Sequence, residues 1–445
     1  MRIAHLPSSY FPETVGGTEA YVRHLCAALS DQGHETAVVW HTAAQPASDD
    51  PHWPEDLVRL PPFPPRRRRD LYRTSTNGEP PGFREFLIDW KPDLVHFHAF
   101  TLGAGLGHAQ LARTMGVPYM ATYHTPAMSC LRGTLMRWGN EGCDGKLEPR
   151  RCAACVLHAR GWPKLLAQLA AGSPLSSSAV PDGPWLVPAA LPSLLAEAQA
   201  AWCEFFSGSA HVLACAEFCA NVLYANGIPP DRVTVLRQAL PGTDRKRRLK
   251  LPLRRPRPSA RLGFFGRFTP AKGPDLLVEA TRRLRAEGVD VVAELVGPIP
   301  EAERPWAQRF LQNANGGARY LGVKQGEDLA NWLTTLDLVV LPSRCPETGP
   351  LTLLEAWDRG VPVIGTDLGG IRDFVAAAGL SAFLFPINDL SGLAAAVRRV
   401  LAWDGPAPEV CIPGVEGLAQ RMEEIYQRCT YLPATTPVSE EIQAP

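Results

Sequence analysis

Residues 346–370 of the chain are PETGPLTLLEAWDRGVPVIGTDLGG, and this stretch says most about the fold. Pro350 suits the first turn of a helix, where its missing N–H costs nothing, and Gly360 suits the residue just past the helix end. The mostly apolar run Leu336–Leu341 ahead of the stretch predicts a buried strand. A helix that begins at the carboxyl end of a parallel strand presents free N–H groups and a positive dipole end, so this junction predicts an anion site.

Two glutamates stand eight positions apart across this junction. We expect Glu347 to lie in the loop and Glu355 to lie one turn into the helix, on the same side. A nucleotide-sugar site requires a bound phosphate and carboxylates that accept sugar hydroxyls. Here the helix start formed by Gly349, Pro350 and Leu351 would hold the phosphate between the two glutamates.

The order Glu-x7-Glu, followed by Gly-x-Pro-Val-Ile-Gly-Thr-Asp-x-Gly-Gly, closely resembles the donor-site motif of family-4 retaining glycosyltransferases. The resemblance implies an α/β fold of the GT-B type, with two facing Rossmann-like doubly wound domains and a cleft between them. It also implies transfer of a sugar from a nucleoside diphosphate sugar to an acceptor hydroxyl, with the anomeric configuration retained. We expect no catalytic divalent metal, because the family's site does not require one and this sequence has no Asp-x-Asp run.

Composition is that of a globular protein with two domains of roughly 200 residues each, since the chain has 445 residues. Its formal net charge is zero, so no overall field favours nucleic acid as a partner. The apolar run at Met1–Pro7 is too short for a signal peptide, and no uninterrupted apolar run is long enough to predict a transmembrane helix. We therefore expect a cytoplasmic protein whose eleven cysteines are thiols or metal ligands.

Strand and helix patterns alternate in both halves of the chain, which implies parallel pairing in doubly wound sheets. We expect the first-half strands at Arg2–Leu6, Thr36–Trp40, Leu94–His98, Pro118–His124, His211–Cys215 and Val233–Arg237, with helices at Thr18–Gln32 and Phe218–Asn226. We expect the second-half strands at Leu262–Gly266, Val291–Val296, Leu336–Leu341 and Val361–Gly365, and a last helix at Val415–Arg428.

These patterns predict a first domain over residues 1–240 and a second domain over residues 259–408. The resemblance implies that the first lies on the acceptor side and that the second binds the nucleotide sugar. The sequence also predicts a basic, solvated linker at 241–258, a helix within 409–430 and a disordered tail at 431–445. The resemblance implies that this last helix crosses back to the first domain.

Two segments of the first domain break the alternation. Residues 43–80, which are rich in Pro and polar residues, predict a mobile surface loop, and residues 127–205 predict an insertion with a Cys-bearing stretch and short helices. The basic runs at Arg66–Arg69 and 245–257 are either solvated loops or a means of peripheral association with an anionic membrane face. In the second case a glycan or lipid-linked acceptor would be met at the inner face of the membrane.

Further candidate site residues follow strands. Gly16 and Gly17 lie between the first strand and the first helix, where the backbone can approach a ligand closely. Arg267 and Lys272 match the family's Gly-Arg…Lys-Gly pattern and would supply the fixed cations that a leaving diphosphate needs. His124 ends an apolar strand; alone it indicates a structural role, but the resemblance implies contact with a distal hydroxyl of the donor sugar.

Two neighbouring histidines, His96 and His98, flank Phe97 on an earlier strand, and we interpret them as core or rim residues.

Four cysteines, Cys130, Cys143, Cys152 and Cys155, lie within 26 residues, and the last two have the Cys-x2-Cys spacing of a structural zinc site. Free thiols, a four-cysteine zinc site and an iron–sulfur cluster are the alternatives. Residues 127–160 have few large apolar side chains, so a metal would supply the folding free energy that the segment lacks. On this argument we predict that the four thiolates converge on one structural zinc.

Two other functions stay open. A catalytically inactive GT-B module would bind the nucleotide sugar without transferring it, but both glutamates, Arg267, Lys272 and His124 are present. A nucleic-acid-binding protein is disfavoured because the arginine runs lie in predicted loops with little aromatic interleaving.

Overall fold

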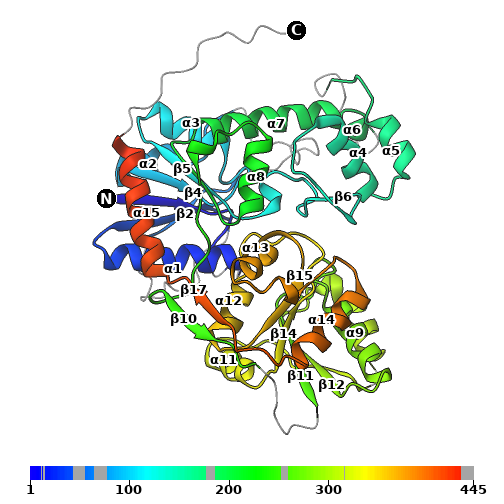
Figure 1. Ribbon diagram of the computed structural model, residues 1–445. Coiled ribbons are helices and arrows are strands. Elements are labelled where there is room, and N and C mark those ends of the chain that lie inside the picture. Colours follow the sequence, from blue (N-terminus) through cyan, green and yellow to red (C-terminus); the bar gives the residue numbers. More distant parts are fainter. Residues whose placement is uncertain are drawn as a thin grey trace.

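The computed structural model describes residues 1–11, 13, 16–43, 56–64, 78–176, 186–251, 259–314 and 316–431, without the side chains of residues 186, 187 and 431. Two parallel sheets, each covered by helices, form two lobes that face each other (Figure 1). The α/β class with two doubly wound sheets is therefore confirmed. The predicted tail beyond residue 431, the run Arg66–Arg69 and residues 252–258 of the predicted linker lie outside the described residues.

The first sheet has seven strands in the order β3-β2-β1-β4-β5-β8-β9, all parallel. Its strands are β1 (Arg2–Leu6), β2 (Glu35–His41), β3 (Asp56–Leu60), β4 (Leu94–Phe97), β5 (Tyr119–Tyr123), β8 (Val212–Ala214) and β9 (Val233–Val235). The strand order reverses between β1 and β4, which is where a crevice opens at the carboxyl ends of the strands.

Helices α1 (Gly17–Asp31), α2 (Phe83–Trp90), α3 (Leu106–Thr114) and α8 (Glu217–Ala225) cover the first sheet. In α1 the expected face is buried, since Val22, Leu25 and Leu29 have no exposed area. Gly33 follows the helix with a φ of +83°, as a helix stop requires.

The second sheet has six parallel strands in the order β13-β12-β11-β14-β15-β16. They are β11 (Ala260–Phe265), β12 (Val291–Val296), β13 (Ala318–Tyr320), β14 (Leu338–Leu341), β15 (Val363–Thr366) and β16 (Leu384–Phe385). Helices α9 (Pro274–Ala286), α10 (Arg304–Gln312), α11 (Gly326–Thr334), α12 (Leu351–Asp358), α13 (Gly369–Ala377) and α14 (Leu390–Leu401) accompany them. Its order reverses between β11 and β14, so the loops after these two strands line the second crevice.

Two chain crossings join the lobes. Strand β10 (Arg245–Arg248) pairs antiparallel with β17 (Glu409–Ile412), and α15 (Val415–Tyr431) then packs on the first lobe. Leu418 and Met422 of α15 belong to the same buried cluster as Leu25 of α1.

The solvated linker expected at 241–258 is thus wrong for residues 245–248, which form strand β10. A two-stranded ribbon tolerates charges on its exposed side. Here Arg245 Nε also lies 2.6 Å from Asp358 Oδ1, and Lys246 Nζ lies 3.1 Å from Glu409 Oε1. These ion pairs offset the like-charge repulsion on which the linker prediction rested.

The loop expected over residues 43–80 is also wrong in part, because β3 (Asp56–Leu60) adds an edge strand to the first sheet beside β2. This strand is short and only partly buried, so its own sequence gives little sign of it.

The insertion projects from the first lobe (Figure 1). It contains a hairpin of β6 (Met136–Arg137) and β7 (Glu141–Gly142) and the helices α4 (Pro149–Ala159), α5 (Lys164–Ala170), α6 (Leu186–Ala189) and α7 (Leu191–Gly208). A buried cluster of its own includes Ala153, Leu157, Leu191 and Leu194. None of the helices in the described part of the chain combines the length and apolarity that crossing a bilayer requires.

Candidate active site

The loop from β14 to α12 holds the two glutamates. Pro350 is the N-cap residue of α12, one residue ahead of the first turn in which we expected it, and Gly360 follows the helix with a φ of +70°, as predicted. Gly360 and Val361 donate their N–H groups to the last turn of the helix. At the other end of α12, the first N–H groups have no partner within the helix, and they lie at the carboxyl edge of the second sheet, because α12 follows β14.

Glu347 forms an ion pair with Lys272. Its Oε2 accepts a hydrogen bond from Lys272 Nζ at 2.6 Å, and its Oε1 accepts one from the hydroxyl of Ser343. The Glu347 side chain is 12% exposed and that of Lys272 is 38% exposed. The structure thus brings together a carboxylate and an ammonium group that are 75 residues apart in sequence.

Glu355 lies on α12 and is half-buried. It has no hydrogen-bond or ion-pair partner among the described residues, and burial raises the pKa of its carboxyl to about 7. A half-buried carboxylate without a protein partner is costly unless a ligand satisfies it. This makes Glu355 a candidate ligand-binding group.

Gly16 and Gly17 of the first lobe lie against the second lobe. A Cβ atom added to Gly16 would lie 3.8 Å from a terminal guanidinium nitrogen of Arg267, and one added to Gly17 would lie 4.0 Å from Leu351 Cδ1. Arg267, which follows β11, is exposed. The glycine loop of the first lobe therefore lies close to Arg267 and to the start of α12 in the second lobe, and a phosphate site at this place stays a prediction.

The loop from β14 to α12, which we call the donor loop after the role that the sequence predicts for its glutamates, is held on both sides. Gly370 donates its N–H to the Glu347 carbonyl at 2.6 Å, while the Thr348 hydroxyl donates to the His124 carbonyl of the first lobe. A Cβ atom on Gly349 would lie only 2.7 Å from Gln238 Cδ, so Gly349 permits a close approach of the first lobe. Sequence reasoning missed Ser343, Thr348 and Gln238, although Ser343 is a polar residue directly after a strand.

His124 is buried, with 2% of its surface exposed. Its Nε2 and His98 Nδ1 are joined by a hydrogen bond of 3.0 Å, and its Nδ1 lies 3.7 Å from Cys215 Sγ. Both ring nitrogens therefore have protein partners, and the ring has little access to the cleft. Contact between this ring and the donor sugar stays a prediction, whereas its backbone carbonyl does contact the donor loop.

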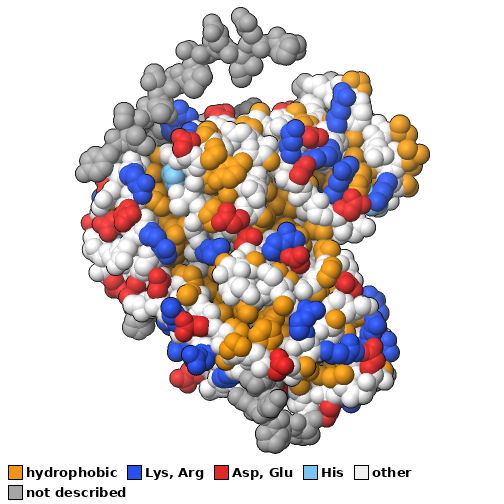
Figure 2. All heavy atoms as spheres, in the orientation of Figure 1, with side chains coloured by type: hydrophobic (Ala, Val, Ile, Leu, Met, Phe, Trp, Pro, Cys, Tyr) orange, Lys and Arg blue, Asp and Glu red, His pale blue; other side chains and the backbone are white. Residues whose placement is uncertain are grey.

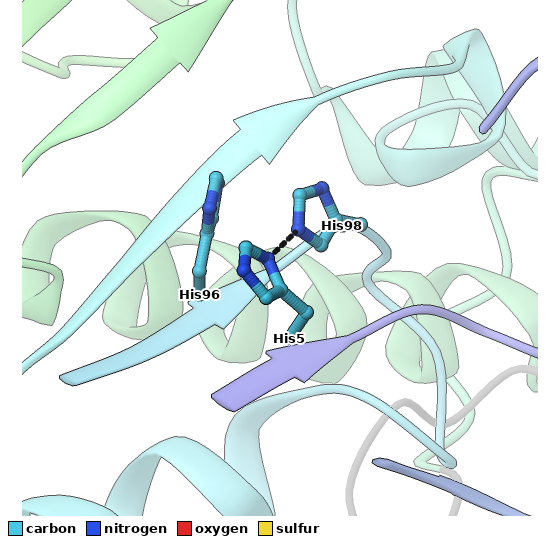
Figure 3. A group of neighbouring side chains, drawn as sticks. All are labelled: His5, His96 and His98. Atoms are coloured by element: carbon cyan, nitrogen blue, oxygen red, sulfur yellow. Dashed lines mark hydrogen bonds between the residues drawn. The ribbon is translucent and has the colours of Figure 1, made fainter. Parts of the chain in front are cut away.

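Two more histidines, His5 and His96, continue this cluster beyond His98. His5, His96 and His98 converge from β1 and from the end of β4, and a 2.9 Å hydrogen bond joins His5 Nδ1 to His98 Nε2 (Figure 3). Their potential ligand atoms lie within 4.8 Å of one another. Both nitrogens of His96 are bonded, to Tyr426 at 2.9 Å and Thr122 at 2.7 Å, whereas His5 Nε2 is buried without a hydrogen-bond partner among the described residues.

The four cysteines do not form the metal site that we predicted. In the described part of the chain, only the His5, His96 and His98 group brings three or more potential ligand atoms within 4.8 Å. Cys152 and Cys155 lie on the regular helix α4 rather than in a knuckle turn. The insertion is ordered by its own apolar cluster, which the argument for zinc overlooked.

All four cysteines instead line one pocket in the insertion. Leu135, Met136 and Trp202 give it a largely apolar wall, and the Trp202 indole N–H has no hydrogen-bond partner among the described residues. Met128 belongs to the same wall and its sulfur accepts a hydrogen bond from the His124 N–H. The pocket therefore lies next to the segment that contacts the donor loop.

Acid should destabilise the fold through the histidine cluster. Burial lowers the pKa of His5 and His124 to about 3, so these rings stay neutral in the folded chain. Below the unfolded-state pKa of about 6.5 the unfolded chain takes up more protons, so stability is full above that pH and falls as pH decreases towards 3. Each ring should then cost about 2 kcal/mol of stability by about pH 5.

Urea unfolding at several pH values measures this loss. A His5→Gln variant should lose about 2 kcal/mol less between about pH 7.5 and pH 5 than the wild type does. Equal pH dependence of the two proteins would show that the His5 ring is not held neutral by the fold.

Comparison with known proteins gives two matching family models. The model described as Glycosyltransferase Family 4 matches residues 15–240, and the one described as Glycosyl transferases group 1 matches residues 259–402. The D-inositol 3-phosphate glycosyltransferase of Arthrobacter sp. (strain FB24) is 27% identical over 377 residues, which cover 80% of this chain and 75% of that enzyme. A GDP-mannose-dependent alpha-mannosyltransferase of Corynebacterium glutamicum is 30% identical over 171 residues, 38% of each chain.

Solved structures show a similar fold. Anabaena Alr3699/HepE, in complex with UDP and glucose, has a TM-score of 0.56 at 16% identity and covers 96% of this chain and 95% of its own. Sucrose-phosphate synthase from Thermosynechococcus elongatus has a TM-score of 0.58 at 18% identity, with 97% and 94% covered. Both likenesses support the GT-B architecture.

Proposed function

This chain belongs to glycosyltransferase family 4 and is a retaining glycosyltransferase. From that premise we propose that the protein binds a nucleoside diphosphate sugar between its lobes and transfers the sugar to a glycan or lipid-linked acceptor. One observation carries the proposal. The Gly16-Gly17 loop of the first lobe lies close to Arg267 and Leu351 of the second lobe, and the Lys272–Glu347 pair lies on the loop that leads into the same helix start.

Each of these groups has a chemical task in such a transfer. Arg267 and Lys272 would neutralise the diphosphate as it leaves, because fixed cations stabilise charge that develops in the transition state. The N–H groups at the start of α12 would hold phosphate oxygens. Glu347 would bind a hydroxyl of the sugar near the reacting carbon, and Glu355 would accept the ribose hydroxyls.

The names of the relatives support a nucleotide-sugar donor, but they do not indicate which nucleobase the donor carries. One is called GDP-mannose-dependent and one solved neighbour is in complex with UDP. For the acceptor, the largely apolar pocket beside His124 supports a molecule with a hydrocarbon part. His124 would then act as a positioning residue, since its carbonyl holds the donor loop through Thr348.

Sugar transfer should not need an added divalent metal, because Lys272 and Arg267 supply the positive charge at the diphosphate. We expect turnover of a nucleotide-sugar panel, measured as release of nucleoside diphosphate, to be unchanged by EDTA. Strict dependence on added Mg²⁺ or Mn²⁺ would contradict the roles given to the two cations. Turnover of no donor, with nucleotide still bound, would favour the inactive binding module.

A further inference from the structure

Helix α5, at the outer end of the insertion, directs its leucines away from the protein. Leu165, Leu166 and Leu169 are 67%, 51% and 67% exposed, while Ala167 is fully buried against α4. The three leucines share one helix face. Helices on the surface of a globular protein ordinarily turn this face inward. The α5 leucine face, defined by these three residues, is therefore an uncovered apolar surface.

The segment that carries the α5 leucine face is basic, although Arg151 within it is ion-paired with Asp144 and Glu148. Residues 149–176 contain Arg150, Arg151, Arg160 and Lys164 but no Asp or Glu. Arg150, Arg160 and Lys164 are exposed. In Figure 2, hydrophobic and basic side chains, with some acidic ones among them, lie next to each other at this end of the molecule. Cations beside apolar side chains complement the headgroups and hydrocarbon of an anionic bilayer.

Trp138 of the neighbouring hairpin adds a residue type that suits the membrane interface. Lys164 Nζ lies 5.5 Å from the centroid of its ring, and Arg137 Cζ lies 5.8 Å from it. The Trp138 ring and the two cations near it combine apolar and positively charged surface, as the α5 leucine face and its neighbouring cations do.

We propose that the α5 leucine face, with its surrounding cations, docks this protein on an anionic lipid bilayer. The surface differs from the one that the basic runs suggested. Arg245 and Arg247 of β10 are both ion-paired with Asp358, and Arg66–Arg69 lies outside the described residues. Docking by α5 would bring the pocket of the insertion near the membrane. The proposal stands apart from the donor chemistry, because vesicle binding needs no sugar transfer.

Vesicle co-sedimentation of the full chain tests the proposal. We expect binding to phosphatidylcholine vesicles that contain phosphatidylglycerol, and weaker binding without phosphatidylglycerol or at high salt. Replacing Leu165, Leu166 and Leu169 together by Gln, which keeps helix propensity, should lower the vesicle partition coefficient by at least about tenfold. Lys164→Glu should weaken binding to the anionic vesicles alone.

The matched control is the double variant Ile88→Gln and Val323→Gln, because these side chains are 52% and 54% exposed elsewhere on the protein. It should bind vesicles like the wild type, and both variants should keep the thermal unfolding midpoint and nucleotide binding of the wild type. Wild-type protein that ignores anionic vesicles, or a triple variant that binds them equally well, would overturn the proposal. So would a dimer that the triple variant alone dissociates, since the face would then contact a second copy of the chain.

Discussion

Replacing Arg267 by Ala should slow sugar transfer by roughly 30- to 1,000-fold, and replacing Lys272 by Ala should have an effect of similar size. Removal of one preorganised group from a site that stabilises developing charge costs about 2–4 kcal/mol in the barrier. Arg267 lies beside the Gly16-Gly17 loop and Lys272 bonds Glu347 at 2.6 Å, so both cations border the space where the diphosphate would lie. Steady-state kinetics with the donor identified from the panel measures the loss.

The control for these variants is Arg319→Ala, because Arg319 is exposed on the edge strand β13, outside the cleft. It should keep wild-type turnover. The combined loss for Lys272→Ala and Glu347→Gln should be smaller than the sum of the single losses, because the two side chains form one pair. Full activity of Arg267→Ala or Lys272→Ala would remove the cationic role from that residue.

Substitutions of the two glutamates should affect different quantities, kcat for Glu347 and nucleotide affinity for Glu355. Glu347→Gln should lower kcat by about two orders of magnitude with a small effect on nucleotide affinity, because its contact would matter most in the transition state. Glu355→Gln should weaken nucleotide binding by about tenfold or more, the value of hydrogen bonds to a charged group, while kcat changes little. Kinetics and calorimetry on both variants separate these effects.

Two outcomes would contradict these roles. One is negligible loss of turnover in both variants. The other is a reversed pattern, in which Glu347→Gln weakens only nucleotide binding and Glu355→Gln lowers only kcat.

The local sequence pattern was sufficient to predict the structure where a residue's surroundings depend mainly on the helix or strand to which it belongs. The strand Val291–Val296 and the helix end at Gly360 were predicted correctly, and the helix start at Pro350 to within one residue, because buried parallel strands are apolar runs and helix ends have their own residue preferences. The positions of Arg267 and Glu347 after strands β11 and β14 also followed, since these strands flank the point where the strand order reverses.

Long-range contacts explain what the sequence did not indicate. Strand β10 depends on pairing with β17, which lies more than 160 residues away in the chain. The ring of His124 is buried because His98 and Cys215 come from other strands of the sheet or their ends. The cysteine spacing indicated a zinc knuckle, but a helix formed there because Ala153 and Leu157 could pack against α7.

The central claim is that the second lobe holds a nucleoside diphosphate at the start of α12, beside Glu355 and Arg267. Calorimetric titration of the wild type, Glu355→Gln and Arg267→Ala with UDP, GDP and ADP tests it most directly. The account predicts that one nucleotide binds the wild type with a stoichiometry of about one, and binds each variant about tenfold more weakly or worse. Binding of none of the three, or equal binding by all three proteins, would contradict it.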